Sequence, residues 1–180
     1  MCRFFKHLGT VIKHKAVVFK LCCKCGIFWQ GLWHDMSKFS ITEFNESVKY
    51  FTDGKSSPLN NSRKQNGYSL AWLHHKGRNK HHVEFWYDEI NDTQAIMPYK
   101  YAVESLCDKI ASTKTYRKKD YTAQDVLDYW NKEKQVQQMN SKIKEFFNTV
   151  LTDLVNLGEK HVLNKKYLKQ QYSNIVTNTK

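Results

Sequence analysis

Apolar residues recur at helical spacing along most of the chain. In the first 33 residues the series includes Val11, Val18 and Leu21, seven and three residues apart, which places them on one face of a helix. The same stripe carries His14, so this histidine points the same way as its apolar neighbours. The pattern therefore predicts a long first helix whose buried face includes an imidazole.

Further helices are expected along the rest of the chain. Ser40 followed three residues later by Glu43 is typical of a capping box and predicts a helix through about Phe51. Residues 53–67 are rich in turn formers and are expected to form a loop, long enough to cover a site, and residues 113–121 are expected to be a basic linker. No alternating pattern is strong enough to predict a strand. The remaining predicted helices cover residues 68–75, 83–90, 98–110, 123–139 and 143–157.

The helical pattern and the composition predict an all-α fold. The chain has only 2 prolines and 7 glycines among 180 residues, which favours long helices with few turns. A chain of this length is expected to form one domain with a sizeable core. We expect a single helical domain over residues 1–157, ended by Gly158, and a polar C-terminal tail over residues 158–180.

The formal net charge of +12 favours an anionic partner. Such a partner is a nucleotide, a nucleic acid, a phosphorylated metabolite or an acidic membrane surface. Solubility alone is the alternative explanation of this charge, and the sequence leaves it open.

The compartment is expected to be the cytoplasm. The 5 cysteines are odd in number and irregularly spaced, which argues against a disulfide framework and favours a reducing environment. Lysines interrupt every apolar run near the N-terminus, so we expect no signal peptide. No run approaches the ~18 apolar residues of a membrane span.

Two histidine doublets lie within residues 72–86, WLHHKGRNKHHVEFW. His74-His75 and His81-His82 make up half of the 8 histidines of the chain. Neutral imidazole is the commonest metal ligand in proteins, so the doublets predict part of a metal centre. The alternative is a solvated basic loop, because basic residues separate the two doublets.

Four more candidate ligands lie outside the doublets: His14, the pair His34-Asp35, and Asp108. Imidazoles and carboxylates without a thiolate suit Mn, Fe, Zn or Mg. Adjacent residues on a helix reach one metal only if it lies between several helices, as in a bundle whose side chains converge on a central cavity. The sequence therefore predicts a central metal site.

The order of these residues resembles the HD-domain superfamily of metal-dependent phosphohydrolases. The segment 34–38, HDMSK, resembles its H-D-x-x-K motif, and the helix after Pro98 that carries Asp108 resembles the one that brings its last aspartate. The first doublet resembles that of the branch that cleaves cyclic dinucleotides, although the G-Y-P signature of that branch is absent. Over residues 7–116 the chain is also similar to an uncharacterised bacterial and phage family with H-D-x-S-K and W-L-H-H-x-x-R-N-x-H-H-x-E-x-W motifs.

The resemblance implies an HD-like helical bundle that holds one or two divalent ions. Asp35 would bridge two metals and serve in catalysis, and one histidine of each doublet would complete the second metal. His75 and His82 are preferred to their neighbours without a firm basis for the choice. The implied metal ligands are His14, His34, Asp35, His75, His82 and Asp108.

Other residues of these motifs are expected to contact substrate or support the ligands. Lys38, Lys76 and Arg78 would neutralise charge on phosphoryl oxygens, and Lys38 would also take part in catalysis. His74 and His81 would support the ligands or donate to phosphate. Glu84 would shuttle a proton or orient a ligand histidine, but a plain carboxylate at a helix N-terminus is the favoured interpretation.

The expected function is a metal-dependent phosphohydrolase, a phosphomonoesterase or phosphodiesterase that acts on a nucleotide with a metal-activated water. Two alternatives stay open at this stage. One is an HD-type di-iron oxygenase, in which the same ligands serve oxygen activation. The other is a non-catalytic basic protein that binds a nucleotide or nucleic acid.

Overall fold

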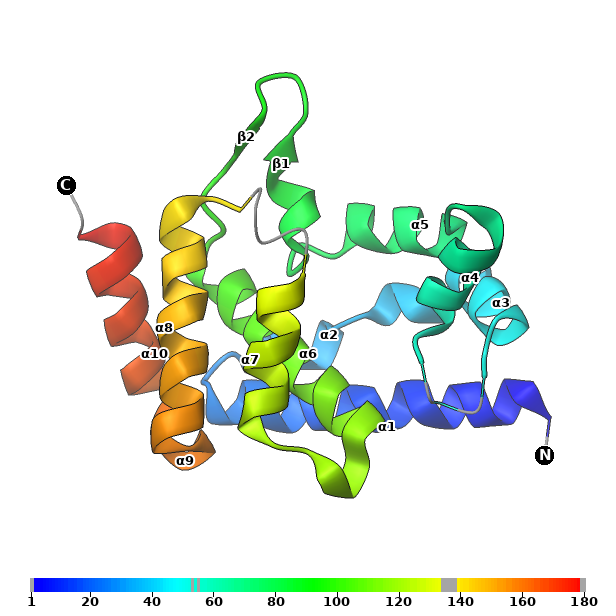
Figure 1. Ribbon diagram of the computed structural model, residues 1–180, viewed down its shortest axis with the longest axis horizontal. Helices are drawn as coiled ribbons and strands as arrows, with labels where there is room; N and C mark the ends of the chain where they lie inside the picture. The colour runs from blue at the N-terminus through cyan, green and yellow to red at the C-terminus, as the bar shows by residue number, and fades with distance from the viewer. Residues whose placement is uncertain (1, 53, 55, 134–138, 179–180) are drawn as a thin grey trace.

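The computed structural model describes residues 2–178 except 53, 55 and 134–138, and the described chain is almost entirely helical (Figure 1). The all-α prediction is therefore confirmed. Short 3₁₀ helices are η1 (Met36–Phe39), η2 (Val83–Trp86) and η3 (Lys118–Asp120), and a π-helical turn, η5, covers Ser173–Thr177. The α-helices are α1 (Arg3–Lys24), α2 (Phe28–Trp33), α3 (Ile41–Lys49), α4 (Pro58–Asn66), α5 (Leu70–Arg78), α6 (Tyr99–Arg117), α7 (Ala123–Lys132), α8 (Ser141–Leu157), α9 (Glu159–Val162) and α10 (Lys165–Tyr172).

Helix α6 is the centre of the bundle. It contacts α1, α2, α7 and α10, and Val103, Leu106 and Ile110 are completely buried. A helix surrounded on several sides needs apolar or small residues around much of its circumference. It also continues to Arg117, so the basic linker expected at residues 113–121 is wrong for most of its length.

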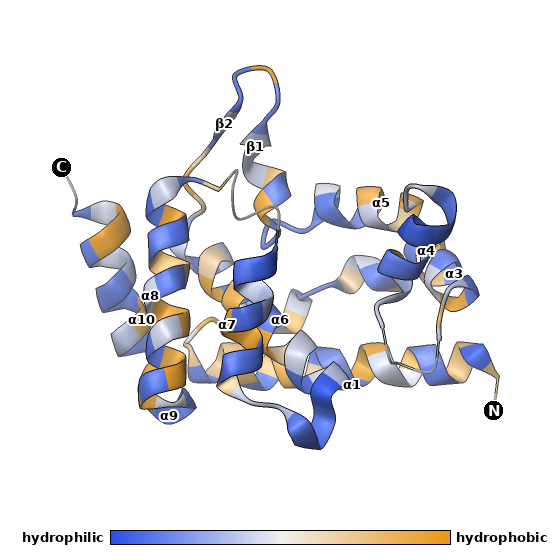
Figure 2. Cartoon of the chain, in the orientation of Figure 1, coloured by the Kyte–Doolittle hydropathy of each residue, from blue (hydrophilic) through white to orange (hydrophobic). Residues whose placement is uncertain are grey.

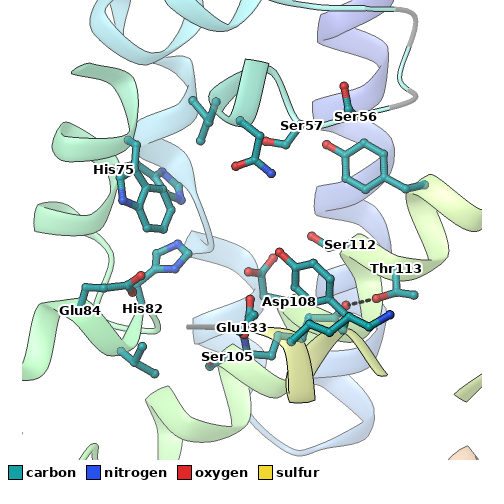
Figure 3. Close-up of a pocket in the computed structure, with 18 of the residues that line it drawn as sticks. Ser56, Ser57, His75, His82, Glu84, Ser105, Asp108, Ser112, Thr113 and Glu133 are labelled. Atoms are coloured by element: carbon teal, nitrogen blue, oxygen red, sulfur yellow. Dashed lines mark hydrogen bonds and ion pairs between the residues drawn. The ribbon is translucent and has the colours of Figure 1, made fainter. Parts of the chain in front are cut away.

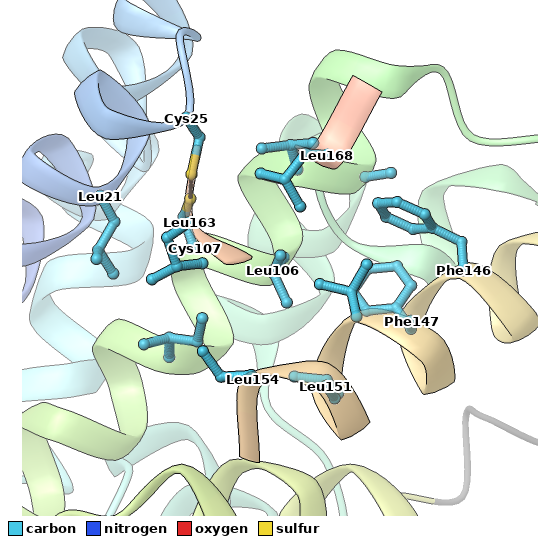
Figure 4. Packing of buried hydrophobic residues seen from close by; sticks show 14 of the residues in the cluster. Leu21, Cys25, Leu106, Cys107, Phe146, Phe147, Leu151, Leu154, Leu163 and Leu168 are labelled. Carbon is cyan, nitrogen blue, oxygen red and sulfur yellow. Dashed lines mark hydrogen bonds between the residues drawn. The ribbon is translucent and has the colours of Figure 1, made fainter. Parts of the chain in front are cut away.

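The hydrophobic core joins α1, α6, α7, α8 and the segment after Gly158 (Figure 4). Leu106 of α6 packs in one cluster with Phe146 and Phe147 of α8. The ring of Trp130 on α7 stacks on Phe147 with centroids 4.8 Å apart. Hydrophobic and hydrophilic positions mix along α8 (Figure 2), as expected of a helix with one buried face.

The chain after Gly158 contributes to this core and is not a polar tail. Val162, Leu163, Leu168 and Val176 are all buried in the cluster formed by α6 and α8. The expectation for residues 158–180 was wrong for the described part because these apolar residues are few and separated by lysines and glutamines. These four side chains attach the C-terminal segment to the core although they are widely spaced, because each of them is completely or almost completely buried.

The expected loop at residues 53–67 contains helix α4. Pro58 lies in its first turn, and Gly67 ends it with φ 81°, a left-handed conformation that glycine adopts without steric cost. Asn61 donates through Nδ2 to the Tyr50 carbonyl at 3.0 Å, so polar contacts attach α4 to α3. Periodicity missed α4 because the helix is polar on most of its surface.

A β-hairpin replaces the second half of the helix expected at residues 83–90. After η2, strand β1 (Tyr87–Asp88) pairs antiparallel with β2 (Thr93–Gln94). Asp88 Oδ1 accepts a hydrogen bond from the backbone of Ile90 at 3.1 Å, which closes the turn. The helix expected at residues 123–139 is α7 as far as Lys132, and positions 134–138 lie outside the described residues.

Three cysteines are buried as free thiols where α1 meets α6. Cys22, Cys25 and Cys107 have no exposed surface, and the sulfurs of Cys25 and Cys107 lie 3.8 Å apart (Figure 4). These thiols pack in the hydrophobic core as small apolar groups. Among the described residues, no helix has the length and apolar character that crossing a bilayer requires.

Candidate metal centre

His34 and Asp35 lie in the turn between α2 and η1, not on a helix. Asp35 has φ 53° and ψ 29°, a left-handed conformation that costs an L-residue about 1–2 kcal/mol. This turn brings both side chains to the same side of the backbone, with His34 Nε2 3.1 Å from Asp35 Oδ2. Strain of this kind concentrates at functional sites.

The first group of candidate ligands joins this turn to α1 and α6. It consists of His14, His34, Asp35 and Asp108, whose ligand atoms all lie within 4.8 Å of one another. His14 Nε2 is 3.0 Å from Asp108 Oδ1, and His34 Nε2 is 3.5 Å from the same oxygen. The four residues come from three elements that the fold brings to one point.

The second group joins the same turn to α5 and the turn after it. Asp35, His75, His81 and His82 offer ligand atoms within 4.8 Å of one another. Asp35 Oδ1 lies 3.3 Å from His75 Nε2 and 3.5 Å from His81 Nε2. Asp35 therefore belongs to both groups, with one oxygen toward each.

Helix α5 is held in place by α3, and this fixes His75. The Ser69 hydroxyl caps α5 by accepting from the Trp72 backbone N–H at 3.1 Å. Glu46 on α3 accepts from the Ser69 hydroxyl at 2.6 Å and from the Ala71 N–H at 3.0 Å. A carboxylate at a helix N-terminus also interacts favourably with the helix dipole.

The centre is buried, and several of its polar atoms lack a hydrogen bond. His34, Asp35 and His81 are at most 3% exposed. Although carboxylate oxygens lie within ion-pair distance, Nε2 of His14, His34, His81 and His82 has no hydrogen bond of acceptable geometry among the described residues. A buried polar atom without a partner costs about 1–3 kcal/mol. A divalent cation would occupy these lone pairs, so the donor set fits a metal.

The charges of the centre also suit a cation. Burial opposes ionisation of Asp35, but His34 and Lys38 outweigh it and hold the pKa of this carboxyl well below its usual range. Burial likewise opposes ionisation of Asp108, and His14 and His34 outweigh it, so its pKa is also well below the usual range. Burial lowers the pKa of the His14 and His82 rings, which favours the neutral, ligating form. Burial also opposes protonation of His34, but Asp35 and Asp108 outweigh it and raise its pKa, so a cation bound there would displace a proton from this ring.

Two glutamates orient the histidine rings from behind. Glu104 Oε1 lies 3.0 Å from Nδ1 of His34 and 3.3 Å from Nδ1 of His81. Glu43 Oε2 lies 2.8 Å from Nδ1 of His75. A carboxylate that accepts from Nδ1 leaves Nε2 free to face the metal.

Sequence reasoning missed both glutamates as parts of the site. Ser40 does cap α3, accepting from the Glu43 N–H at 3.3 Å, so the predicted helix start is confirmed. The Glu43 side chain, however, reaches the histidines and does not close the capping box. The signal for Glu104 was its position four residues before Asp108, which places both on one face of α6.

The two histidine doublets contribute differently to the ligand groups: both histidines of the second doublet belong to one, but only His75 of the first does. His81 belongs to the second ligand group, whereas the sequence suggested that it supports ligands or donates to phosphate. His74 lies outside both groups, with Nδ1 2.6 Å from Glu43 Oε1 and Nε2 accepting from Arg78 Nε at 2.8 Å. Lys76 is half-buried on α5 and does not line the cavity beside the centre.

A cavity of about 550 Å³ opens onto the centre. Figure 3 shows His75 and His82 on one side of it and Asp108 on the other. Glu84 lies on its wall, as do residues of α4, α6 and α7. Its cationic lining residues are Lys38, Arg63, Lys109, Arg117 and Lys132.

Lys38 connects the cavity with the ligand cluster. Its Nζ lies 2.6 Å from Asp35 Oδ2, and 27% of its side chain is exposed. Burial would lower the pKa of Lys38, but Asp35 and Asp108 outweigh it and raise the pKa above its usual range. The ammonium group therefore stays charged at the inner end of the cavity.

Comparison with known proteins identifies the family but no activity. The model of a family of unknown function, DUF5662, matches residues 3–153, and the chain belongs to this family. The matched region contains both ligand groups and the two glutamates behind them. No curated protein and no solved structure matches the chain.

Proposed function

We propose that this member of the DUF5662 family is a metal-dependent phosphohydrolase that uses two divalent cations. The observation that carries the proposal is the position of Asp35 between two ligand groups that share it. A shared carboxylate can hold two cations at the separation of about 3.5–4 Å found in two-metal hydrolases. One cation would take His14, His34, Asp35 and Asp108, and the other Asp35, His75, His81 and His82.

Bound cations would lower the pKa of a water molecule and neutralise charge on phosphoryl oxygens. The residues of the chain contribute positioning and charge. Glu104 and Glu43 fix the ring orientations of His34 and His75. Lys38 both holds Asp35 and presents an ammonium group to the cavity, where it would donate to a phosphoryl oxygen.

The cavity supports a nucleotide as the substrate class. Its volume is in the range of sites for small molecules and cofactors. The Arg63 guanidinium lies 4.5 Å from the centroid of the Trp72 ring, and both residues line the cavity. A planar cation and an aromatic ring are suited to stack on a base and to bind phosphate.

The proposal is tested by loading the full chain separately with Mn, Fe, Zn and Mg and measuring phosphate-ester cleavage. Nucleoside monophosphates, diphosphates and cyclic nucleotides serve as substrates. We expect Asp35→Asn and His82→Gln to lower the rate by at least about 100-fold, since each removes a metal ligand. His161→Gln is the matched control, because His161 is exposed on α9 and should leave activity unchanged.

Two results would contradict the proposal and support the alternatives. If the iron-loaded protein consumes dioxygen with a polyol or phosphonate and cleaves no phosphate ester, the centre belongs to an oxygenase. If the protein binds nucleotides but shows no turnover with any of the four metals, it is a binding protein.

A further inference from the structure

Helix α1 has a second apolar face, opposite the one that carries His14. Phe5, Ile12, Ala16 and Cys23 fall on one stripe along the helix and are exposed, Phe5 by 62% and Ile12 by 53%. The inward stripe already supplies the core contacts of α1. The exposed stripe therefore needs another explanation.

Helix α2 extends this surface with aromatic side chains. Trp29 and Trp33, one turn apart, are each 66% exposed. The ring of Phe28 packs on Phe19 of α1 with centroids 5.3 Å apart, so α2 lies against α1 and adds its exposed side chains to those of the stripe. We call this surface the aromatic face, made of Phe5, Ile12, Phe28, Trp29, Leu32 and Trp33.

An exposed apolar surface of this kind marks an interaction site, because single exposed residues are common but contiguous patches are not. None of the residues of this face lines the cavity. An interaction at the aromatic face therefore leaves the cavity open.

The charge around the aromatic face has one sign. Residues 1–34 contain no Asp or Glu. On α1, Lys13, Lys20 and Lys24 are exposed and lie along one flank of the apolar stripe. The basic residues of this segment are Arg3, Lys6, Lys13, Lys15, Lys20 and Lys24.

The positive charge indicates which kind of binding partner fits the aromatic face. A second copy of the chain would bring two acid-free, basic segments together, and the like charges would repel. An anionic surface is instead complementary to them. Tryptophan favours the boundary between lipid headgroups and acyl chains, where an amphipathic helix lies parallel to the membrane plane.

We propose that the aromatic face docks this protein on the surface of an anionic lipid bilayer. The aromatic and aliphatic side chains enter the headgroup region, and the lysines contact the acidic headgroups. His14, on the opposite side of α1, points inward to the metal cluster. The docked protein therefore keeps its cavity accessible to water-soluble molecules.

The experiment is co-sedimentation of the full chain with vesicles of phosphatidylcholine, with and without phosphatidylglycerol. We expect binding to the anionic vesicles, weaker at high salt, and little binding to the neutral ones. Lys13→Glu with Lys20→Glu should reduce binding at least about 30-fold, since each lysine near an anionic surface contributes about fivefold. Trp29→Ser with Trp33→Ser should reduce it by at least about tenfold.

Two control variants carry the same kinds of substitution at exposed positions outside the aromatic face. Lys166→Glu with Lys169→Glu reverses two exposed charges on α10, and Ile90→Ser removes a side chain that is 93% exposed in the hairpin. Both should bind anionic vesicles as the unmodified protein does. Circular dichroism and metal content show whether each variant is folded.

Three outcomes would overturn the proposal. The first is absence of binding to anionic vesicles. The second is equal loss of binding in the control variants, which would indicate attraction by net charge alone. The third is a dimer in analytical ultracentrifugation that the Trp29→Ser, Trp33→Ser variant dissociates, because a second copy would then cover the face.

Discussion

Asp35 is the residue on which the site depends most. Its left-handed backbone conformation points one carboxylate oxygen toward each ligand group. Its neighbours His34 and Lys38 lower the pKa of this carboxyl group and so keep it ionised. The same short segment thus supplies a ligand, the shared carboxylate and a cation that faces the cavity.

At the residue scale, Glu104 is predicted to control metal affinity without touching the metal. Glu104→Gln keeps the shape but removes the charge that accepts from His34 and His81. We expect metal affinity to fall about 10–100-fold, measured by competition with a chelator. Glu89→Gln, at an exposed position in the hairpin, is the matched control. Equal affinities for the two variants would exclude this role for Glu104.

His7 is predicted to make the fold sensitive to acid. Burial, aided by the charge of Lys38, lowers the pKa of His7 from its ordinary 6.5 to about 4, and its ring packs against Phe44 and Phe51. Between these two pH values the unfolded chain binds a proton that the folded chain does not. Stability is therefore fully present above about pH 6.5 and falls as the pH decreases, by up to about 3 kcal/mol below pH 4.

The prediction is checked by urea unfolding of the unmodified protein and His7→Phe across this pH range. Since carboxylates elsewhere also titrate in acid, the difference between the two proteins isolates His7. We expect the variant to lose less stability on acidification. Parallel pH profiles would show that His7 is protonated equally in the folded and unfolded chains.

At the scale of elements, the contact between α1 and α2 fixes the turn that carries His34 and Asp35. A Cβ atom on Gly31 would lie 2.6 Å from Cys22 Cβ and 3.2 Å from Phe19 Cα. Gly31→Ala should therefore destabilise the fold by about 1–3 kcal/mol and weaken metal binding, because α2 must move away. Urea unfolding and chelator competition measure the two effects.

Gly9→Ala provides the matched control on α1. A Cβ atom there meets no atom within 4 Å, so alanine should stabilise the helix by about 0.5–1 kcal/mol and leave metal binding unchanged. If both substitutions had the same effect, close packing at Gly31 would not be the cause.

The sequence predicted the elements that have a clear apolar period. The inward stripe of α1 and the cap of α3 at Ser40 were both visible in the residue pattern. Helix α4 and the hairpin were not, because α4 is held by polar contacts and the hairpin has strands of only two residues. Such elements form through tertiary contacts that local periodicity does not contain.

The site was predictable in part for a related reason. The resemblance to the HD superfamily named His14, His34, Asp35 and Asp108, which the structure brings together. It could not choose within the doublets, because local backbone geometry decides which of two adjacent histidines faces the centre, on α5 for His74-His75 and in the turn after it for His81-His82. Glu43 was interpreted only as part of a capping box, and the spacing of Glu104 from Asp108 does not by itself indicate a ligand partner. Their contacts with the histidines follow only from three-dimensional proximity.

At the scale of the whole molecule, the C-terminal segment is predicted to be essential for folding. A chain ending at residue 157 would lose Leu168 and Val162 and expose Phe146 and the apolar face of α6. We expect this truncated chain to be unfolded or aggregated, as measured by circular dichroism and size-exclusion chromatography. A truncated chain with an unchanged unfolding transition would restore the expectation of a separate polar tail.

The fold as a whole places two chemically different regions on opposite sides of α1. The inward side carries His14 and the candidate centre, and the outward side carries the aromatic face. The cavity lies between α4, α5, α6 and α7, away from that face. Substitutions at Phe5 or Ile12 on α1 should therefore change the aromatic face without removing a candidate metal ligand.

The two-metal centre is tested most directly by a crystal structure of the manganese-loaded protein with anomalous scattering data. Two anomalous peaks are expected, one on each side of Asp35. The first should contact His14, His34 and Asp108, and the second should contact histidines 75, 81 and 82. A fully loaded crystal with no peak beside Asp35, or with peaks only at surface histidines such as His161, would contradict it.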